Sequence, residues 1–331
     1  MKLTRRAALT GVAWLGSCRR PEGRSVRIIA VGIQEFFPLF LAQELGHFQE
    51  AGLEVAIDVV AGGSKAVEAL MAGSSDVMCD NWDYTLFRAP QGRRLRAFTI
   101  VLLTPSRLLA VAPAQADRIQ RVEDLKGATV GVGSFGGTHH RILEYFLSVH
   151  GLKISDVQVV VIGAGPSAVA AFEHGKVDAG ILTWSSYNVL KLRAPRTRAL
   201  IHPRSREEKR RVFGIEDLPS HSLFAREDWL AAHPAQARAL AEGMLRTMRW
   251  LREHPAEEIR ALMPERFRTA YPEADLETIR AVVDALSPDG VMPPGGPEAV
   301  AKAVTSAVDR EREPNFDLSK TYTNEFVKPV K

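Results

Sequence analysis

A repeated alternation of short apolar runs with amphipathic helical patterns constrains the fold of this chain most strongly. From Arg27 on, strand-like runs such as Ile28 to Val31 and Leu53 to Val60 alternate with helical patterns, and only short turns separate them. This order is typical of α/β sheets with mostly parallel strands, because a helix returns the chain between two parallel strands. The pattern restarts midway, which predicts two doubly wound α/β units in tandem over residues 26 to about 221. After Leu223 the pattern is nearly all helical.

The clearest unit of this kind is Ala128 to Tyr145, a strand followed by a glycine-rich turn and a helical pattern. A helix that begins after such a turn presents unpaired backbone N–H groups and the positive end of its dipole. These groups attract an anion or a polar ligand oxygen. The turn is therefore a candidate ligand site, with Ser134 and Thr138 as its first side chains.

The same stretch contains a G-x-G-x-x-G motif at Gly131, Gly133 and Gly136. A dinucleotide site also needs an acidic residue at the end of the next strand, for the ribose hydroxyl. That strand, Val157 to Ile162, ends in Gly163, and Asp156 lies before it. The sequence therefore disfavours a nicotinamide cofactor, and we expect no cofactor at all.

The turns after successive predicted strands share glycines, hydroxyls and large aromatic side chains. In open α/β sheets, ligands bind outside the carboxyl ends of the strands. Glycine and serine supply N–H and O–H donors there, and Phe and Trp supply apolar walls, which suits binding without covalent chemistry. The candidate ligand-binding residues are Gln34, Phe36, Phe37, Gly63, Ser64, Asn81, Trp82, Asp83, Ser134, Phe135, Gly136, Gly137, Thr138, Gly165, Thr183 and Trp184.

The N-terminus reads as an export signal over residues 1–17. Three basic residues precede an apolar run, and Thr4 to Leu9 resembles a twin-arginine signal. Leu15 to Cys18 resembles a variant lipobox, in which Cys18 would carry the lipid. Residues 18–25 are polar and contain Pro21 and Gly23, as expected of a tether.

Charge and cysteine content narrow the function further. Cleavage after residue 17 lowers the formal charge from +4 to +1, because Lys2, Arg5 and Arg6 are lost. A near-neutral protein offers no electrostatic reason to bind nucleic acid. The only cysteines are Cys18 and Cys79, so a lipidated or cleaved Cys18 leaves no disulfide.

Several segments, in order and spacing, resemble the solute-binding proteins of ABC importers. The branch concerned includes the nitrate, taurine and alkanesulfonate receptors and the thiamine-precursor receptors, and the resemblance covers nearly the whole mature chain. The segments that carry it are Phe37 to Ala42, Leu45 to Leu53, Ala61 to Ser64, Ala66 to Asp76, Val122 to Gly127, Ala170 to Ala179, Ser287 to Gly290 and Leu318 to Phe326.

This resemblance implies a two-lobe periplasmic-binding-protein-like fold of type 2, with a hinge and a central ligand cleft. Lobe 1 would hold residues 26–111 and 222–331, and lobe 2 residues 112–221, with hinges near 111–113 and 220–222. The protein would be an exported monomer in the periplasm or at the outer face of the cytoplasmic membrane. It would capture a small organic solute and deliver it to a permease and, through that permease, an ATPase.

The ligand itself is constrained by departures from the family pattern. Asp80, Trp82 and Asp83 occupy a turn that is usually small and neutral, and Glu35 is near in sequence. Carboxylates would repel a sulfonate or nitrate but accept bonds from an amino or ring N–H. With the aromatic residues, they favour an aromatic or heteroaromatic compound over a sulfonate, and over nitrate.

Three alternatives remain in view. Asp80 and Asp83 could be an acid–base pair, although helix capping by Asp83 or Asn81 explains them equally well. A pyrimidine synthase shares the fold, but it consumes its own histidine and needs iron and a cysteine-rich stretch. The third is a ligand-sensing domain that partners a membrane receptor. His139 and His140 point to different sides of a helix and have no third ligand at metal spacing, so we expect no metal site.

Overall fold

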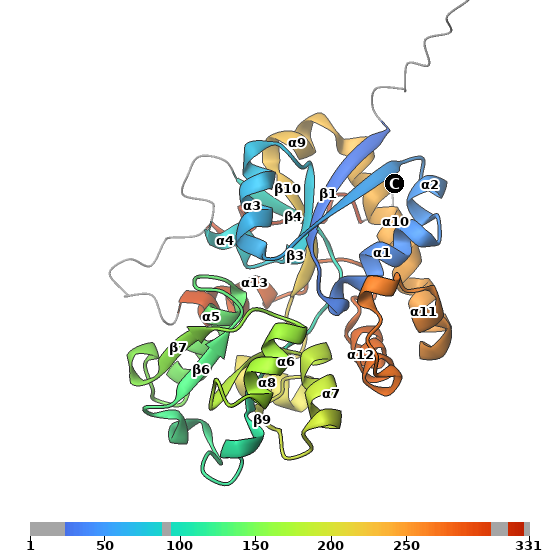
Figure 1. Cartoon of the computed structure of the whole chain (residues 1–331). Coiled ribbons are helices and arrows are strands. Elements are labelled where there is room, and N and C mark those ends of the chain that lie inside the picture. Colours follow the sequence, from blue (N-terminus) through green and yellow to red (C-terminus); the bar gives the residue numbers. More distant parts are fainter. Residues whose placement is uncertain (1–23, 88–93, 306–316, 328–331) are drawn as a thin grey trace, which may run out of the picture.

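The computed structural model describes residues 24–87, 94–305 and 317–327, and it contains two five-stranded sheets (Figure 1). The first sheet has the strand order β2-β1-β3-β10-β4. Its strands are β1 (Ser25–Val31), β2 (Glu54–Val60), β3 (Val77–Asn81), β4 (Leu95–Ile100) and β10 (His221–Arg226).

The second sheet repeats this layout in the order β7-β6-β8-β5-β9. Its strands are β5 (Arg107–Val111), β6 (Thr129–Val132), β7 (Gln158–Val161), β8 (Ala179–Thr183) and β9 (Arg198–Ile201). The two α/β units expected from the alternating pattern are therefore present, one around each sheet.

Each sheet contains a single strand that runs against the others. β10 is antiparallel to both β3 and β4, and β5 is antiparallel to both β8 and β9. The neighbouring pairs β1–β2, β1–β3, β6–β7 and β6–β8 are parallel. The sheets are thus mixed, with most strands in one direction, and the reversed strand lies next to the place where the chain changes sheets.

The chain crosses between the sheets twice, after β4 and after β9. Because β5 pairs within the second sheet, the first crossing lies between Ile100 and Arg107, ahead of the hinge predicted at 111–113. The second crossing ends where β10 begins at His221, within the hinge predicted at 220–222. The sequence did not predict β5, β9 or β10. β5 follows β4 with no helix between them, and β9 and β10 lie on either side of an arginine-rich helix.

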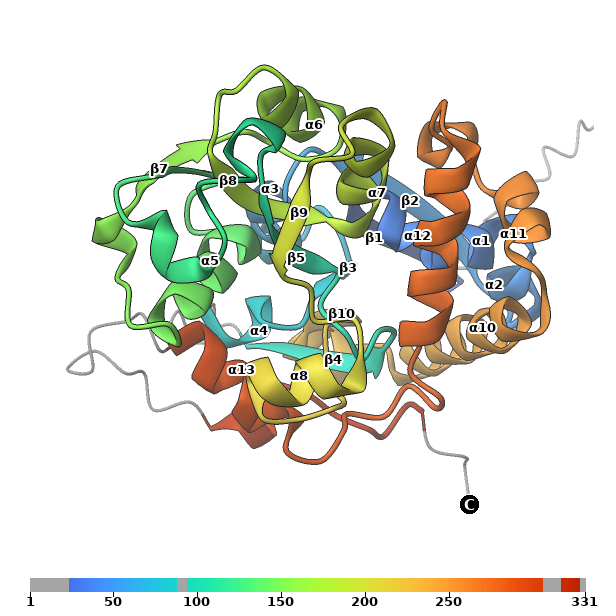
Figure 2. The same ribbon diagram turned by 90° about the horizontal axis from the view of Figure 1, so that it is seen from below.

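Helices cover both sheets (Figure 1). α12 packs against α7 and α13 against α5, so the C-terminal helices of the first unit reach the second (Figure 2). The helices are α1 (Phe37–Glu44), α2 (His47–Glu50), α3 (Gly63–Ala72), α4 (Tyr84–Phe87), α5 (Thr138–Ser148), α6 (Pro166–Glu173), α7 (Trp184–Arg193), α8 (Arg206–Phe213), α9 (Glu227–Ala232), α10 (Pro234–Glu253), α11 (Ala256–Leu262), α12 (Pro272–Ala285) and α13 (Gly296–Thr305).

Local sequence explains where many of these helices begin. Proline occupies one of the first two positions of α1, α6, α10 and α12, where its missing N–H costs nothing. Thr183 caps α7, because its hydroxyl accepts a bond from the backbone N–H of Ser186 at 3.2 Å. These caps place several helix starts directly after strand ends.

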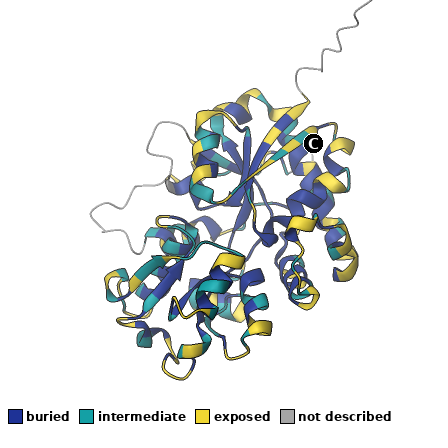
Figure 3. Cartoon of the chain, viewed as in Figure 1, coloured by how far each residue is buried: buried dark blue, intermediate teal, exposed yellow. Residues whose placement is uncertain are grey.

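The apolar core is continuous between the two units. One buried cluster joins Phe40 and Leu240 of the first unit to Phe172 and Leu190 of the second. A second cluster likewise contains residues of both sheets (Figure 3). The two units therefore share apolar contacts in addition to the two crossing segments. No helix in the described ranges is long and apolar enough to span a bilayer.

A pair of facing glycines lets β6 and β8 lie close together. A Cβ atom on Gly180 would lie 2.8 Å from the backbone oxygen of Gly131 and 3.1 Å from its N and Cα atoms. We expect Gly180→Ala to lower the free energy of unfolding by about 2 kcal/mol, since backbone atoms cannot yield as a flexible side chain does. Urea unfolding measures this.

Gly62→Ala is the matched control, because a Cβ at Gly62 meets nothing within 4 Å. We expect it to change the unfolding free energy by less than about 1 kcal/mol. Equal losses in the two variants would contradict the proposed close contact.

Candidate functional site

A cavity of about 840 Å³ lies between the carboxyl ends of strands from both sheets. The first sheet contributes Val31 to Gln34, after β1, and Val59 to Ala61, at the end of β2. The second sheet contributes Gly163 to Ser167, after β7, and the first turn of α7. Arg266 to Tyr271, between α11 and α12, completes the wall. We call this the inter-sheet cavity.

The wall from the C-terminal part of the chain carries positive charge. Arg266 lies over the rings of Phe40 and Phe267, with its guanidinium carbon 4.6 Å and 5.2 Å from the ring centres. Arg193 pairs with Glu173 at 2.7 Å, both on the opposite wall. The cavity therefore has a basic rim and an apolar interior of strand and helix side chains.

Gln34 lines this cavity and carries one unused, buried acceptor. Its side-chain N–H group donates to the carbonyl oxygen of Phe267 and to Asp275 Oδ1, each at 2.8 Å, which fixes the orientation of the amide. Its Oε1 is buried and has no hydrogen-bond partner among the described residues. A buried acceptor without a partner is costly, so an N–H donor of a ligand that reached this oxygen would be stabilised there.

Glu35 connects the two sheets beneath the cavity. Its carboxylate accepts bonds from the backbone N–H of Ser185 at 2.7 Å and from the Ser185 hydroxyl at 3.2 Å. Ser185 lies in the first turn of α7, where the helix dipole favours a negative charge. A buried carboxylate of the first sheet is thus held by the second.

Beside Glu35, a cluster of buried polar groups fills the region between the strand ends. Asp80 is the last but one residue of β3, and its Oδ1 accepts bonds from the backbone and side-chain N–H groups of Asn81 at 2.7 Å and 2.9 Å. Its Oδ2 has no partner among the described residues, and neither does Nε of the buried Arg107. Gly63 leaves room for this arrangement, because a Cβ there would lie 2.2 Å from Tyr84 Oη and 2.8 Å from Asp80 Oδ2.

Burial changes the protonation of this cluster. It raises the pKa of Asp80 to about 7, against bonds from Asn81 and the charge of Arg107, which act in the opposite direction. It lowers the pKa of His139 and of His221 well below the usual value, and nearby Arg107 lowers both further. Both imidazoles are therefore neutral near pH 7, so the formal charges lie on the carboxylates and arginines.

A second charged contact joins the two units at Asp83. Arg141 of α5 donates to Asp83 Oδ2 from Nη2 at 2.6 Å and from Nε at 3.1 Å, and both side chains are buried. The Thr138 hydroxyl lies 3.3 Å from both carboxylate oxygens. Asp83 is therefore neutralised by the second unit and does not face the cavity as a free charge.

The predicted site residues divide among several environments. Gln34 and Gly165 line the inter-sheet cavity. Asn81, Trp82, Asp83 and Thr138 line a small cavity of about 50 Å³ near α13. Trp184 lines a third cavity, on the side of the crossing segments. The residues that line none of these three are Phe36, Phe37, Gly63, Ser64, Ser134, Phe135, Gly136, Gly137 and Thr183.

The glycine-rich turn Ser134 to Thr138 has an exposed tip. Phe135 is 60% exposed, and Gly136 adopts a φ of +65°, which favours glycine. Gly137 precedes α5 in extended conformation, so the expected strand, turn and helix are present. The turn contributes to the junction of the units through Thr138, and Arg141 one turn later binds Asp83.

The predicted aromatic walls are mostly internal. Phe37 is fully buried in the apolar core, and Phe36 stacks on His221 with ring centres 4.1 Å apart. Trp82 and Trp184 are also buried, and the indole N–H of each has no partner among the described residues. These rings support the region between the sheets and do not line the inter-sheet cavity.

Sequence reasoning missed Arg107, Tyr84, Arg141, His221 and the wall segment 266–271. Arg107 begins the strand β5, which was not predicted, so nothing in the sequence indicated that Arg107 lies at the junction of the sheets. Arg141 could have been predicted from the sequence, because it lies three residues after Thr138 on the same face of the helix. Among the described residues, no group of three or more His, Cys, Asp or Glu lies close enough to hold a metal ion.

Comparison with solved structures confirms the two-lobe periplasmic-binding-protein fold. A protein from Bordetella bronchiseptica RB50 is 31% identical, with a TM-score of 0.84 over 92% of this chain and 95% of that one. The ligand-binding component of an ABC-type import system from Staphylococcus aureus is 12% identical, with a TM-score of 0.70 over 92% and 98%. The aliphatic sulphonate-binding protein SsuA of Escherichia coli is 20% identical, with a TM-score of 0.65 over 92% and 99%.

Sequence comparison gives the family and two kinds of relative. The family model described as NMT1/THI5 like matches residues 33–258. YtlA, a candidate binding protein of Bacillus subtilis (strain 168), is 22% identical over 78% of this chain and 76% of its own. The 4-amino-5-hydroxymethyl-2-methylpyrimidine phosphate synthase of Schizosaccharomyces pombe is 29% identical over 44% of this chain, which spans only 40% of the synthase.

The buried carboxyl of Asp80 generates a prediction on pH. The unfolded chain ionises Asp80 near pH 4 and the folded protein near pH 7, so between these values the folded protein holds the extra proton. Stability therefore falls as pH rises across this window. Relative to wild type, we expect Asp80→Asn to gain up to about 1.4 kcal/mol per pH unit from pH 4 to 7 and then to level off. Denaturant unfolding at several pH values tests this, and a difference independent of pH would contradict it.

Proposed function

Because the chain belongs to the NMT1/THI5-like family, we propose that it is the substrate-binding component of an ABC importer. It would capture a small organic solute between its two lobes and deliver it to the permease and, through it, to the ATPase. The observation that carries this proposal is the inter-sheet cavity, whose walls come from strand ends of both sheets. A pocket shared by two hinged units can close around a ligand without altering it.

Strand pairing suggests how the lobes divide. Lobe 1 would comprise residues up to about 100 and from about 221 on, and lobe 2 the residues between. Helices α12 and α13 would belong to lobe 1 by sequence but rest against lobe 2. Residues 1–23, which include the predicted twin-arginine signal and Cys18, lie outside the described residues. Export to the periplasm, or to the outer face of the cytoplasmic membrane through a lipid on Cys18, is part of this proposal, as is a monomeric state.

The unused acceptor of Gln34 favours a ligand that carries an N–H donor. An aromatic or heteroaromatic compound with an amino group or ring N–H meets this need, whereas a simple sulfonate offers acceptors only. Glu35 and Asp83 are held by Ser185 and Arg141, so they do not exclude an anionic group at the basic rim. We therefore rank an N–H-bearing aromatic compound ahead of a sulfonate.

The synthases among the relatives keep an enzyme of the same fold as the second candidate. Cys79 is the one cysteine in the described part of the chain, and burial raises the pKa of its thiol. A buried neutral thiol is a poor metal ligand and a poor nucleophile. Incubation with candidate solutes separates the two functions, because a binding protein returns its ligand unchanged. A role as a sensory domain would differ in its partner, a membrane receptor in place of a permease.

The ligand class is tested first by a thermal-shift screen and then by calorimetry. The screen covers aminopyrimidines, aromatic acids, sulfonates and oxyanions, since a bound ligand raises the unfolding temperature. For the compound that binds, we expect Gln34→Leu to weaken affinity about tenfold, because the accepted N–H bond is lost.

Gln43→Leu serves as the control, because Gln43 lies on the exposed side of α1 and binds only the carbonyl oxygen of Val55 in the described structure. It should leave affinity unchanged. The proposal fails if no compound in the screen binds or if the bound compound is recovered chemically altered.

We propose that the ion pair between Asp83 and Arg141 holds the two lobes together. Arg141→Met leaves a buried carboxylate without its cation, so we expect a loss of about 3 kcal/mol in unfolding free energy or an opening of the lobes. Small-angle scattering would detect the opening as a larger radius of gyration.

Arg196→Met is the matched control, because Arg196 pairs with Asp117 at an exposed site within lobe 2. For this control we expect the unfolding free energy to fall by less than about 1 kcal/mol and the radius of gyration to stay unchanged. If Arg141→Met behaves like this control, Asp83 and Arg141 do not hold the lobes together.

A further inference from the structure

The cavity that Trp184 lines has a volume of about 420 Å³ and lies on the side of the molecule where the chain crosses between the sheets. We call it the hinge cavity. Leu103 and Thr104 come from the first crossing segment, and Asp217 comes from the second. Lobe 2 contributes α8 and the residues before it, and lobe 1 contributes α10 and α12. No residue of this hinge cavity lines the inter-sheet cavity.

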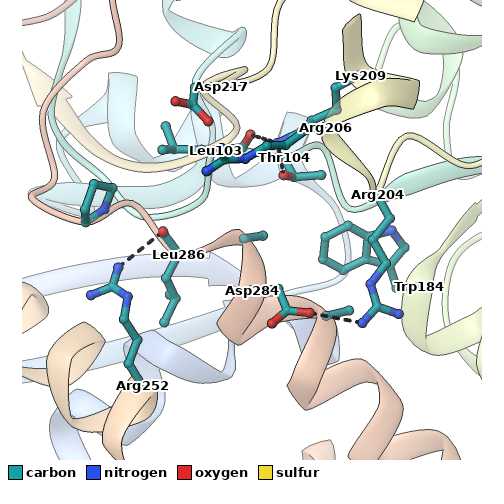
Figure 4. A pocket seen from close by; sticks show the side chains of 13 residues that line it. Leu103, Thr104, Trp184, Arg204, Arg206, Lys209, Asp217, Arg252, Asp284 and Leu286 are labelled. Atoms are coloured by element: carbon teal, nitrogen blue, oxygen red, sulfur yellow. Dashed lines mark hydrogen bonds and ion pairs between the residues drawn. The ribbon is translucent and has the colours of Figure 1, made fainter. Parts of the chain in front are cut away.

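Basic side chains dominate the lining of the hinge cavity (Figure 4). The lining includes Arg204, Arg206, Lys209 and Arg252 against Asp217 and Asp284. Arg204 is already paired, with Asp284 at 3.3 Å and with Glu277 outside the lining. Arg206 lies 3.7 Å from Glu216.

The two remaining cations have only neutral hydrogen-bond partners in the described structure. Lys209 is buried, and its ammonium group donates to Thr104 Oγ1 at 2.9 Å and to the carbonyl oxygen of Leu103 at 3.2 Å. Arg252 donates to the carbonyl oxygens of Met248, Leu286 and Ser287. A buried ammonium without a bonded carboxylate is unfavourable, and burial accordingly lowers the pKa of Lys209.

Trp184 also lines this cavity, and its indole nitrogen is buried behind the cavity wall. Trp184 is 1% exposed, and its indole N–H has no hydrogen-bond partner among the described residues. The carboxylate of Asp217 is exposed, and it acts on Lys209 as a charge without a hydrogen bond.

We propose that the hinge cavity binds a compact anion with several acceptor oxygens, held by Lys209 and Arg252. Inorganic sulfate or phosphate and a small organic dicarboxylate share this chemistry, and the volume admits either. The anion would lie between both crossing segments, α8 of one lobe and α10 and α12 of the other. It would therefore favour the lobe arrangement in which these walls stand together, separately from the solute in the inter-sheet cavity.

Direct binding tests the site without reference to the solute. Sulfate, phosphate and succinate are titrated against the full protein by calorimetry, at constant ionic strength set with sodium chloride. We expect at least one of them to bind, and Lys209→Met and Arg252→Gln each to weaken that binding about tenfold or more, because a charge-assisted bond is lost.

Lys302→Met on the exposed face of α13 removes the same charge outside the cavity, and it should bind the anion as wild type does. Binding that is equal in wild type, Lys209→Met and Lys302→Met would show a general ionic effect and overturn the proposal, as would the absence of binding by all three anions. Arg252 is on the exposed side of α10, so Arg252→Gln remains informative if Lys209→Met fails to fold.

Coupling to the solute rests on the proposed function and has its own test. Solute affinity is measured with and without the anion that binds, in wild type and in Lys209→Met. We expect the anion to change solute affinity in wild type only, by the same factor by which solute changes anion affinity. Anion binding without this reciprocity would leave the site intact and overturn the coupling, and failure to find any solute would concern the proposed function alone.

Discussion

The structure depends on buried carboxylates that are bound across the gap between the two units. Glu35 of the first unit accepts hydrogen bonds from Ser185 of the second, and Asp83 pairs with Arg141. An isolated carboxylate in such surroundings would cost several kcal/mol, so each of these groups requires the partner that the other unit supplies. The closed arrangement is therefore specified by polar contacts, whereas the apolar clusters that span both units supply most of the favourable burial.

The partners of these carboxylates also decide whether the carboxylates would repel an anionic ligand. In the sequence, Asp80, Asp83 and Glu35 suggest a negative cleft that would repel anions. In the structure, Asp83 pairs with Arg141, Glu35 is hydrogen-bonded to Ser185, and burial raises the pKa of Asp80 to about 7. Under the proposed function, the groups that would select a ligand are the unused acceptor of Gln34 and the basic rim formed by the segment 266–271. The contacts of both depend on tertiary packing, so the sequence alone does not show them.

The sequence predicts helices and strands better than it predicts which of them lie side by side in the fold. The strand, glycine turn and helix at Ala128 to Tyr145 were predicted from local patterns and are present as β6 and α5. The strands β5, β9 and β10 were not, because β5 follows β4 without a helix and β9 and β10 flank the arginine-rich helix α8. The candidate site follows the same division. The turns at the strand ends were found, but Arg107 and the wall at 266–271 come from parts of the chain that only tertiary packing brings there.

The two cavities lie on opposite sides of this junction, and the reversed strands explain why. β5 and β10 follow the two crossings, so the sheets are tied together on the side of β4 and β9 and free on the side of β2 and β7. The inter-sheet cavity includes the end of β2 and the turn after β7, where separation of the lobes would be greatest. The hinge cavity is bounded by the crossing segments themselves, where separation would be least. A group bound there acts at the pivot, so a small change in its contacts is amplified at the far edge. The same topology that makes one cavity suitable for capture makes the other suitable for control.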